Sequence, residues 1–134
     1  MNNHLGVMLD CSRNAVMKPE AVKGFVDIIQ KMGYNTLMLY TEDTYEVEGE
    51  PLFGYLRGRY TIAELQDIDY YCRGKGVELI PCIQTLAHLN QIFKFAYYAN
   101  VRDCMDVLLV DEEKTYVLLD KMFQSLANCC PRMI

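Results

Sequence analysis

Short apolar runs alternate with amphipathic stretches along this chain, and the alternation restricts its fold more than any other feature. The apolar runs cover residues 6–10, 36–40 and 77–83, and stretches with helical spacing lie between and after them. Apolar runs of this length, bounded by glycine or polar residues, are typical of parallel strands buried in a sheet. The pattern therefore predicts an α/β chain of about three strand–helix units with right-handed crossovers.

Two of the predicted helices have clear signals at both ends. The first begins at Pro19 and ends at Gly33, where a C-terminal cap is expected. The second begins with the capping-box pair Thr61 and Glu64 and ends at residues 74–76. Their apolar stripes consist of Val22, Phe25, Val26, Ile29 and Met32 in the first helix and of Leu65, Ile68 and Cys72 in the second.

The pattern is weaker after residue 88. Residues 89–98 fit one or two helical turns, and residues 107–110 form an apolar run whose state the pattern leaves open. A third helix is predicted to follow Asp111 as its N-cap, with the acidic residues 112–113 in its first turn, and to end at Pro131. Its predicted stripe consists of Tyr116, Leu119, Met122, Phe123 and Leu126.

Two α/β folds fit three such units: a small doubly wound sheet, and the first half of a TIM (β/α)8 barrel, which needs about 250 residues in full. A doubly wound domain that binds phosphate is expected to have a glycine-rich turn after its first strand, and residues 10–14 contain no glycine. Residues 132–134 are predicted to begin a fourth strand. The chain, residues 1–134, is therefore predicted to be the N-terminal part of a barrel domain.

Composition excludes several classes of partner. The net charge of −5 provides no basic stripe for nucleic acid, and no apolar run approaches the ~20 residues that span a membrane. None of the six cysteines forms a C-x-x-C pair, which predicts reduced thiols in a cytoplasmic protein. Only His4 and His88 could join them in a zinc site, so neither a metal nor a cofactor is predicted.

Polar side chains follow each predicted strand, where the carboxyl ends of parallel strands converge on the catalytic face of a barrel. The residues that would meet there are Asp10 and Arg13, Glu42 and Asp43, and Gln84 and His88. Carboxylates, a guanidinium, an amide and several tyrosines around one mouth suit a carbohydrate, which has many hydroxyl groups and apolar sugar edges. We predict a substrate site that includes Arg13, Glu42, Asp43, Gln84 and His88.

Each of these residues also has a purely structural alternative. Arg13 could pair with Asp10 or Asp43 as a tie between loops, and the residues 42–43 could cap a turn. His88 could be a hydrogen-bonded histidine without a role in proton transfer. The tyrosine-rich loop that follows residue 43 could be hydrophobic packing under a lid.

The chain resembles the catalytic domain of family 20 glycoside hydrolases, the β-N-acetylhexosaminidases, and within them the hexosaminidase D-like branch. The resemblance spans nearly the whole chain. It rests on residues 6–14 (GVMLDCSRN), 39–43 (LYTED), 48–61 (EGEPLFGYLRGRYT) and 81–89 (PCIQTLAHL).

This resemblance implies a (β/α)8 barrel and a role for three of the candidate residues. Arg13 matches the arginine that holds sugar hydroxyls, His88 matches the histidine beside the active site, and Asp43 falls near the acidic pair after the second strand. Asn14 stands where many members have histidine.

The resemblance also implies the reaction, which is removal of terminal β-linked N-acetylhexosamine by substrate-assisted retaining hydrolysis. The family's orienting aspartate and its acid, a glutamate, follow the fourth strand, so no catalytic residue is expected in this chain and the chain alone is expected to be inactive. A different possibility is a non-catalytic half-barrel that binds carbohydrate or self-assembles as a homo-oligomer, because half a barrel leaves sheet edges and an inner apolar face uncovered.

Overall fold

A three-stranded parallel sheet forms the centre of the computed structural model, which describes residues 4–13 and 15–130. The strands are β1 (Gly6–Asp10), β2 (Thr36–Thr41) and β3 (Glu78–Ile83), in the order β1-β2-β3. The register aligns Val7 with Leu37 and Leu37 with Leu79. The prediction of an α/β chain with parallel strands is confirmed, whereas the predicted fourth strand at residues 132–134 lies outside the described residues.

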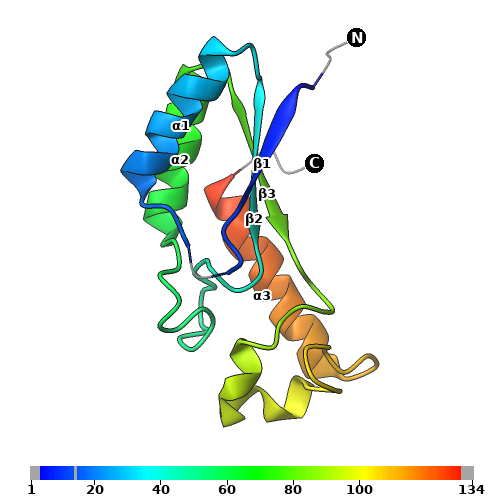
Figure 1. Ribbon diagram of the computed structural model, residues 1–134. Helices are drawn as coiled ribbons and strands as arrows, with labels where there is room; N and C mark the ends of the chain where they lie inside the picture. Colours follow the sequence, from blue (N-terminus) through cyan, green and yellow to red (C-terminus); the bar gives the residue numbers. More distant parts are fainter. Residues whose placement is uncertain (1–3, 14, 131–134) are drawn as a thin grey trace.

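Three α-helices follow the strands in turn: α1 (Pro19–Lys31), α2 (Ile62–Gly74) and α3 (Glu113–Cys129). Figure 1 shows α1 and α2 side by side along the sheet, with α3 on the other side of α2. Leu39 and Leu79 of the sheet line one small internal cavity together with Leu65 of α2 and Leu126 of α3. The helices therefore cover the same face of the sheet, as they do in consecutive units of a (β/α)8 barrel.

The predicted ends of α1 and α2 are confirmed. Pro19 occupies the first turn of α1, and Gly33 beyond its C-terminus has a φ of 88°, which glycine adopts without steric cost. At the start of α2, the Thr61 side chain accepts a hydrogen bond from the Glu64 N–H while Glu64 accepts one from the Thr61 N–H. These reciprocal bonds satisfy backbone donors that a helix start leaves unpaired.

The predicted start of α3 is wrong by one residue. Asp111 has a φ of 70°, whereas an N-cap needs extended backbone, and Glu112 is the N-cap instead. The apolar stripe also differs, because Tyr116 and Phe123 are about half exposed. Their places on the buried face are taken by small polar residues that bond to the surrounding backbone: Thr115 donates to the Leu109 carbonyl, and Ser125 accepts from the Glu48 N–H.

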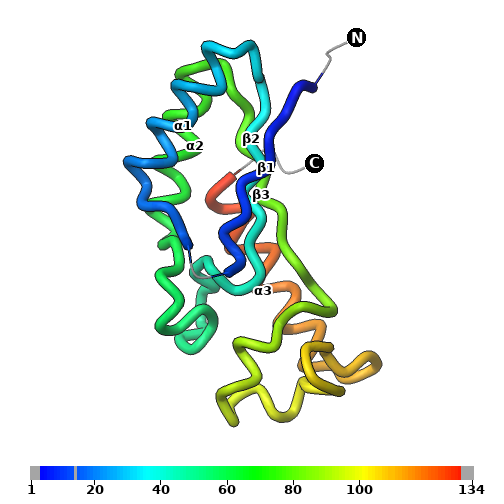
Figure 2. The backbone as a smooth tube through the Cα atoms, in the orientation of Figure 1, coloured from blue at the N-terminus to red at the C-terminus, as the bar shows by residue number. Residues whose placement is uncertain are grey.

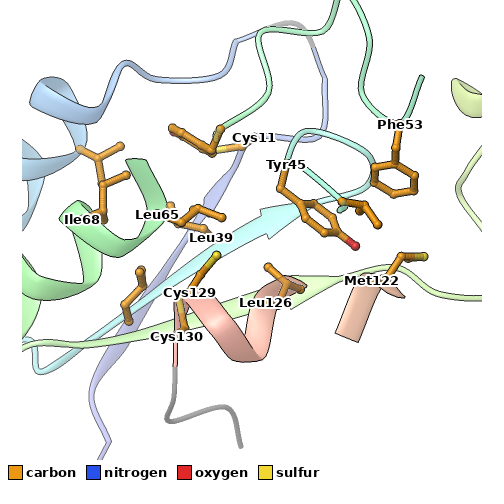
Figure 3. Packing of buried hydrophobic residues seen from close by; sticks show 14 of the residues in the cluster. Cys11, Leu39, Tyr45, Phe53, Leu65, Ile68, Met122, Leu126, Cys129 and Cys130 are labelled. Carbon is orange, nitrogen blue, oxygen red and sulfur yellow. The ribbon is translucent and has the colours of Figure 1, made fainter. Parts of the chain in front are cut away.

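The long loop between β2 and α2 contributes much of the core. Tyr45, Phe53 and Tyr60 are buried, and the Tyr45 and Phe53 rings meet edge to face with centroids 5.2 Å apart. Figure 3 shows this pair beside Met122 and Leu126 of α3. The loop is therefore held by its own aromatic side chains, as the packing alternative for the tyrosine-rich loop predicts.

The segment after β3 forms short 3₁₀-helices, η1 (Ile92–Lys94) and η2 (Ala96–Val101), where one or two helical turns are predicted. Residues 107–110 do not form a strand, and a single antiparallel bridge joins Arg102 to Leu108. The backbone trace in Figure 2 runs through this segment below the end of β3 and then turns back into α3.

The sheet face opposite the helices is only partly covered, as the half-barrel interpretation predicts. Alternation along the strands places Met8, Met38 and Ile80 in one row on this face, and the Met8 side chain is 52% exposed. Within β3 only Leu79 is fully buried. The run at residues 77–83 predicts a buried strand, whereas most of β3 is partly exposed, because the helices pack on one face alone. No helix among residues 4–13 and 15–130 is long and apolar enough to span a membrane.

Candidate functional site

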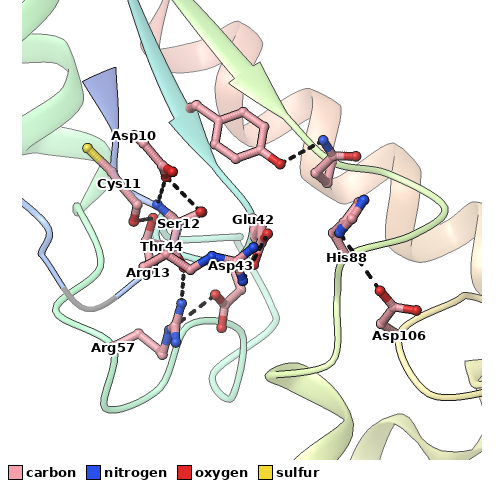
Figure 4. Close-up of polar contacts among 12 residues, drawn as sticks. Asp10, Cys11, Ser12, Arg13, Glu42, Asp43, Thr44, Arg57, His88 and Asp106 are labelled. Atoms are coloured by element: carbon pink, nitrogen blue, oxygen red, sulfur yellow. Dashed lines mark hydrogen bonds and ion pairs between the residues drawn. The ribbon is translucent and has the colours of Figure 1, made fainter. Parts of the chain in front are cut away.

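The carboxyl ends of the three parallel strands lie at the same end of the sheet, at the bottom of Figure 1. The segments that follow β1, β2 and β3 start there, so the structure brings the predicted site residues to one end of the molecule. Figure 4 shows how their side chains lie.

The loop after β1 begins with a tight turn at Asp10. Its Oδ1 accepts hydrogen bonds from the Ser12 N–H at 2.8 Å and the Ser12 hydroxyl at 2.7 Å. These bonds to Ser12, helped by the charge of Arg13, lower the pKa of the Asp10 carboxyl. An aspartate that bonds the backbone two residues ahead stabilises a turn, and this turn carries Arg13 to the mouth of the site.

Arg13 pairs with Glu42, not with the Asp10 or Asp43 partners that the sequence suggested. Arg13 Nη1 lies 3.7 Å from Glu42 Oε1, with 75% of the Arg13 side chain exposed and only 5% of the Glu42 side chain. Arg13 thus keeps most of its donors free for a ligand, while a buried carboxylate faces it from behind.

The Glu42 carboxyl has an unusual environment. Burial raises its pKa, and the nearby charges of Arg13 and His88 act in the opposite direction. Glu42 Oε1 is buried without a hydrogen-bond partner among the described residues. Glu42 is therefore placed beneath the mouth, where its charge attracts the Arg13 guanidinium.

Asp43 turns away from Glu42 towards the long loop. It is 1% exposed, and its Oδ1 lies 3.3 Å from Arg57 Nε. Burial raises the pKa of Asp43, and the Arg57 charge opposes this. Arg57 is a site residue that sequence reasoning did not single out, although it is a cation in a loop that begins with acidic residues.

The side chains that follow β3 complete the candidate site. Gln84 Nε2 donates to the Tyr40 hydroxyl at 2.9 Å, which fixes an amide next to an aromatic ring of β2. His88 has a φ of 61°, and its Nδ1 lies 3.8 Å from Asp106 Oδ2. Tyr40 and Asp106 were not predicted: Tyr40 has its place near a strand end as a sequence signal, whereas Asp106 comes close to His88 only in the folded chain.

Two tyrosines of the long loop are not available at the mouth as the sequence suggested, whereas Tyr55 is 49% exposed and its ring meets Phe95 edge to face. Tyr45 and Tyr60 are 0% and 2% exposed, so their rings cannot stack on a sugar. Tyr40 of β2 does reach the site, where its hydroxyl accepts a hydrogen bond from Gln84. No group of His, Cys, Asp and Glu side chains in the described parts of the chain is arranged to hold a metal ion.

The site thus combines an exposed guanidinium, a buried carboxylate, an amide and an imidazole at the carboxyl ends of parallel strands. These groups can donate to and accept from several hydroxyl or amide groups of a neutral polar ligand.

No protein-family model matches the chain, and no curated protein matches it in sequence. Solved structures do match. A family 20 exo β-N-acetylglucosaminidase from Vibrio harveyi, in complex with N-acetylglucosamine, has a TM-score of 0.85 and 19% identity over 96% of this chain and 26% of that chain. The Streptomyces plicatus N-acetyl-β-hexosaminidase in complex with Thio-NAglucal has a TM-score of 0.80 and 24% identity over 94% of this chain and 30% of that chain.

A chitobiase from Flavobacterium johnsoniae has a TM-score of 0.80 and 23% identity over 96% of this chain and 22% of that chain. These matches confirm the resemblance to family 20 glycoside hydrolases at the level of the fold, and they confirm the partial barrel. This chain spans 22% to 33% of the length of such solved chains.

Proposed function

We propose that this chain forms one wall of the sugar site in a glycoside hydrolase that removes terminal β-linked N-acetylhexosamine by substrate-assisted retaining hydrolysis. The observation that carries the proposal is the pairing of an exposed Arg13 with a buried Glu42 at the carboxyl ends of parallel strands. The fold of this wall is shared with enzymes that were solved with N-acetylglucosamine and related ligands.

Each candidate residue has a chemical role in this proposal. Arg13 donates hydrogen bonds to sugar hydroxyls, and Glu42 holds the guanidinium in place. Gln84 and His88 offer an amide and an imidazole from the segment after β3, and Asp43 supports the long loop. In the reaction, the 2-acetamido oxygen of the substrate attacks the anomeric carbon while an acid protonates the leaving oxygen.

The acid and the carboxylate that orients the acetamido group are proposed to come from outside these 134 residues. The chain covers at most a third of the matched enzymes, which supports this assignment. Residues 1–134 are then the N-terminal part of the barrel, and they contribute binding rather than proton transfer.

Titration of the isotope-labelled chain with N-acetylglucosamine, followed by amide chemical shifts, tests the binding proposal. We expect shifts at Arg13, Glu42, Gln84 and His88 that Arg13→Ala abolishes, and no hydrolysis of a chromogenic N-acetylglucosaminide. The absence of shifts at these residues contradicts sugar binding. Turnover that survives purification and is lost in Arg13→Ala contradicts the proposal that the acid lies elsewhere.

A second candidate function is a non-catalytic half-barrel that self-assembles as a homo-oligomer. The row of Met8, Met38 and Ile80 on the uncovered sheet face favours it, as do the edge strands β1 and β3. Light scattering should then find an oligomer that Met8→Glu dissociates, and a monodisperse monomer contradicts this candidate.

A further inference from the structure

Three side chains of the long loop between β2 and α2 bind the backbone of the segment that follows β1. The bonds run from Thr44 Oγ1 to the Cys11 carbonyl (2.9 Å), from Arg57 Nη2 to the Ser12 carbonyl, and from Tyr60 Oη to the Met17 carbonyl (2.6 Å). The segment that carries Arg13 is therefore held along its length by a loop that lies about 30 to 45 residues away in the sequence. These bonds satisfy backbone acceptors that have no strand partner.

Arg57 differs from the other two donors because it contacts both strand-end segments. Its Nη2 binds the Ser12 carbonyl next to Arg13, and its Nε lies 3.3 Å from Asp43 Oδ1. The Arg57 side chain is only 13% exposed, so its charge is not available to solvent or ligand. Figure 4 shows Arg57 below the segment 10–13, with its guanidinium directed towards that segment and towards Asp43.

The loop that carries Arg57 also packs closely against Asp43. Gly54 has a φ of 65°, and a Cβ atom at this position would overlap the Asp43 carbonyl oxygen. Arg59, two residues after Arg57, donates to the Phe53 carbonyl and so binds only within its own loop. Arg57 is thus the arginine of this loop that reaches both strand ends.

We infer that Arg57 is a positioning residue that sets the relative placement of Arg13 and Asp43 at the sugar site. The placement matters for sugar binding only if the proposed function holds, and in that respect the inference rests on the proposed function. The contact between Arg57 and Asp43 can be measured without a ligand. Because a guanidinium has several donors in a rigid plane, one side chain can fix a carbonyl and a carboxylate at the same time.

The pKa of the Asp43 carboxyl depends on its contact with Arg57. Burial raises its pKa and Arg57 counteracts that effect, with a smaller contribution in the same direction from Lys94 of η1. The other ionisable groups that face it are Glu42 beside it in the chain and the buried Tyr45 hydroxyl. Without Arg57, burial would be opposed only by the backbone hydrogen bond of Asp43 itself and by Lys94, so the carboxyl would protonate at higher pH.

Carboxyl ¹³C chemical shifts of Asp43, followed against pH in the full chain, test the inference. Arg57→Met is expected to raise the Asp43 midpoint by about one pH unit or more, since a nearby arginine lowers a carboxyl pKa by that order. Arg57→Lys keeps a cation at this place and should leave the midpoint near the native value. Arg59→Gln is the matched control and should change nothing. Circular dichroism confirms that each variant is folded, and Arg57→Gln, which removes the charge but keeps a donor, serves if Arg57→Met is not.

The sugar titration separates this inference from the proposed function. A raised Asp43 titration midpoint in Arg57→Met, together with weaker N-acetylglucosamine binding, supports both the inference and the proposed function. A raised midpoint in a chain that binds no sugar supports the placement of Asp43 by Arg57 and overturns the proposed function. An Asp43 midpoint that is the same in Arg57→Met and Arg59→Gln, or a Lys variant that behaves like the Met variant, overturns the inference.

Discussion

Arg13 Nη1 lies 3.7 Å from Glu42 Oε1, which joins the segment after β1 to the end of β2 across the mouth of the site. The two partners differ in environment, because Glu42 is buried and Arg13 is mostly exposed. The buried partner therefore has its charge compensated mainly from the solvent side, by Arg13 and His88. This asymmetry costs stability and leaves the guanidinium available to a ligand.

Glu42→Gln should stabilise the chain at neutral pH. Burial raises the folded-state pKa of Glu42 above its ordinary value, so this carboxyl favours folding when protonated and loses that contribution as pH rises through the folded pKa. Glutamine does not ionise. The gain in unfolding free energy should therefore be larger at pH 7 than at pH 3.5, as measured by urea denaturation. An equal effect at both pH values contradicts the burial of an ionised Glu42.

Arg13→Ala should weaken N-acetylglucosamine binding, and it should also lower stability because it removes a cation that compensates the buried Glu42. A hydrogen bond to a charged donor contributes about 1.5–3 kcal/mol, which corresponds to a loss of ~10-fold or more in affinity. The side chain is 75% exposed, so its removal leaves no cavity. Arg73→Ala is a suitable control, because Arg73 is also exposed and pairs with Asp69 within α2. Equal loss of binding in both variants contradicts a specific role for Arg13.

Gly54→Ala should be far more destabilising than Gly58→Ala. Both glycines have a φ near 65°, and alanine in that conformation costs about 1–2 kcal/mol. Only at Gly54 would the new Cβ meet the Asp43 carbonyl, whereas nothing lies within 4 Å at Gly58. Steric overlap should therefore add about 1–3 kcal/mol in Gly54→Ala. Thermal unfolding of the two variants measures the difference, and similar losses would show that the loop does not pack on Asp43.

Thr61→Ala should lower the unfolding free energy by about 1 kcal/mol through loss of the N-cap of α2. Thr61→Ser retains the hydroxyl and should be close to neutral. Chemical denaturation of both variants separates the cap from the packing of the Thr61 methyl group. If serine destabilises as much as alanine, the hydroxyl bond is not the source of the effect.

The elements of this fold are predictable from the sequence because their signals are local. Pro19, Gly33 and the Thr61–Glu64 pair mark helix ends through the backbone bonds and conformations that these residues favour. The start of α3 was misplaced because the left-handed conformation of Asp111 depends on the preceding turn. No pattern of residue types reports that conformation for an aspartate.

The candidate site was predictable only as a set of strand-end residues. Which charges pair there depends on contacts between distant segments, such as Arg13 with Glu42 and Asp43 with Arg57. The burial of Tyr45 and Tyr60 has the same origin, since their rings fill space between the long loop and its neighbours. Aromatic residues look alike in a sequence whether they pack in a core or face a ligand.

The sheet order β1-β2-β3 follows the order of the chain, so every strand pairs with one made just before it. A ribosome adds about 5–20 residues each second, whereas a helix forms within about a microsecond. Each new unit can therefore dock on a finished neighbour as it is synthesised. In this topology, the time of emergence during translation sets the order of assembly.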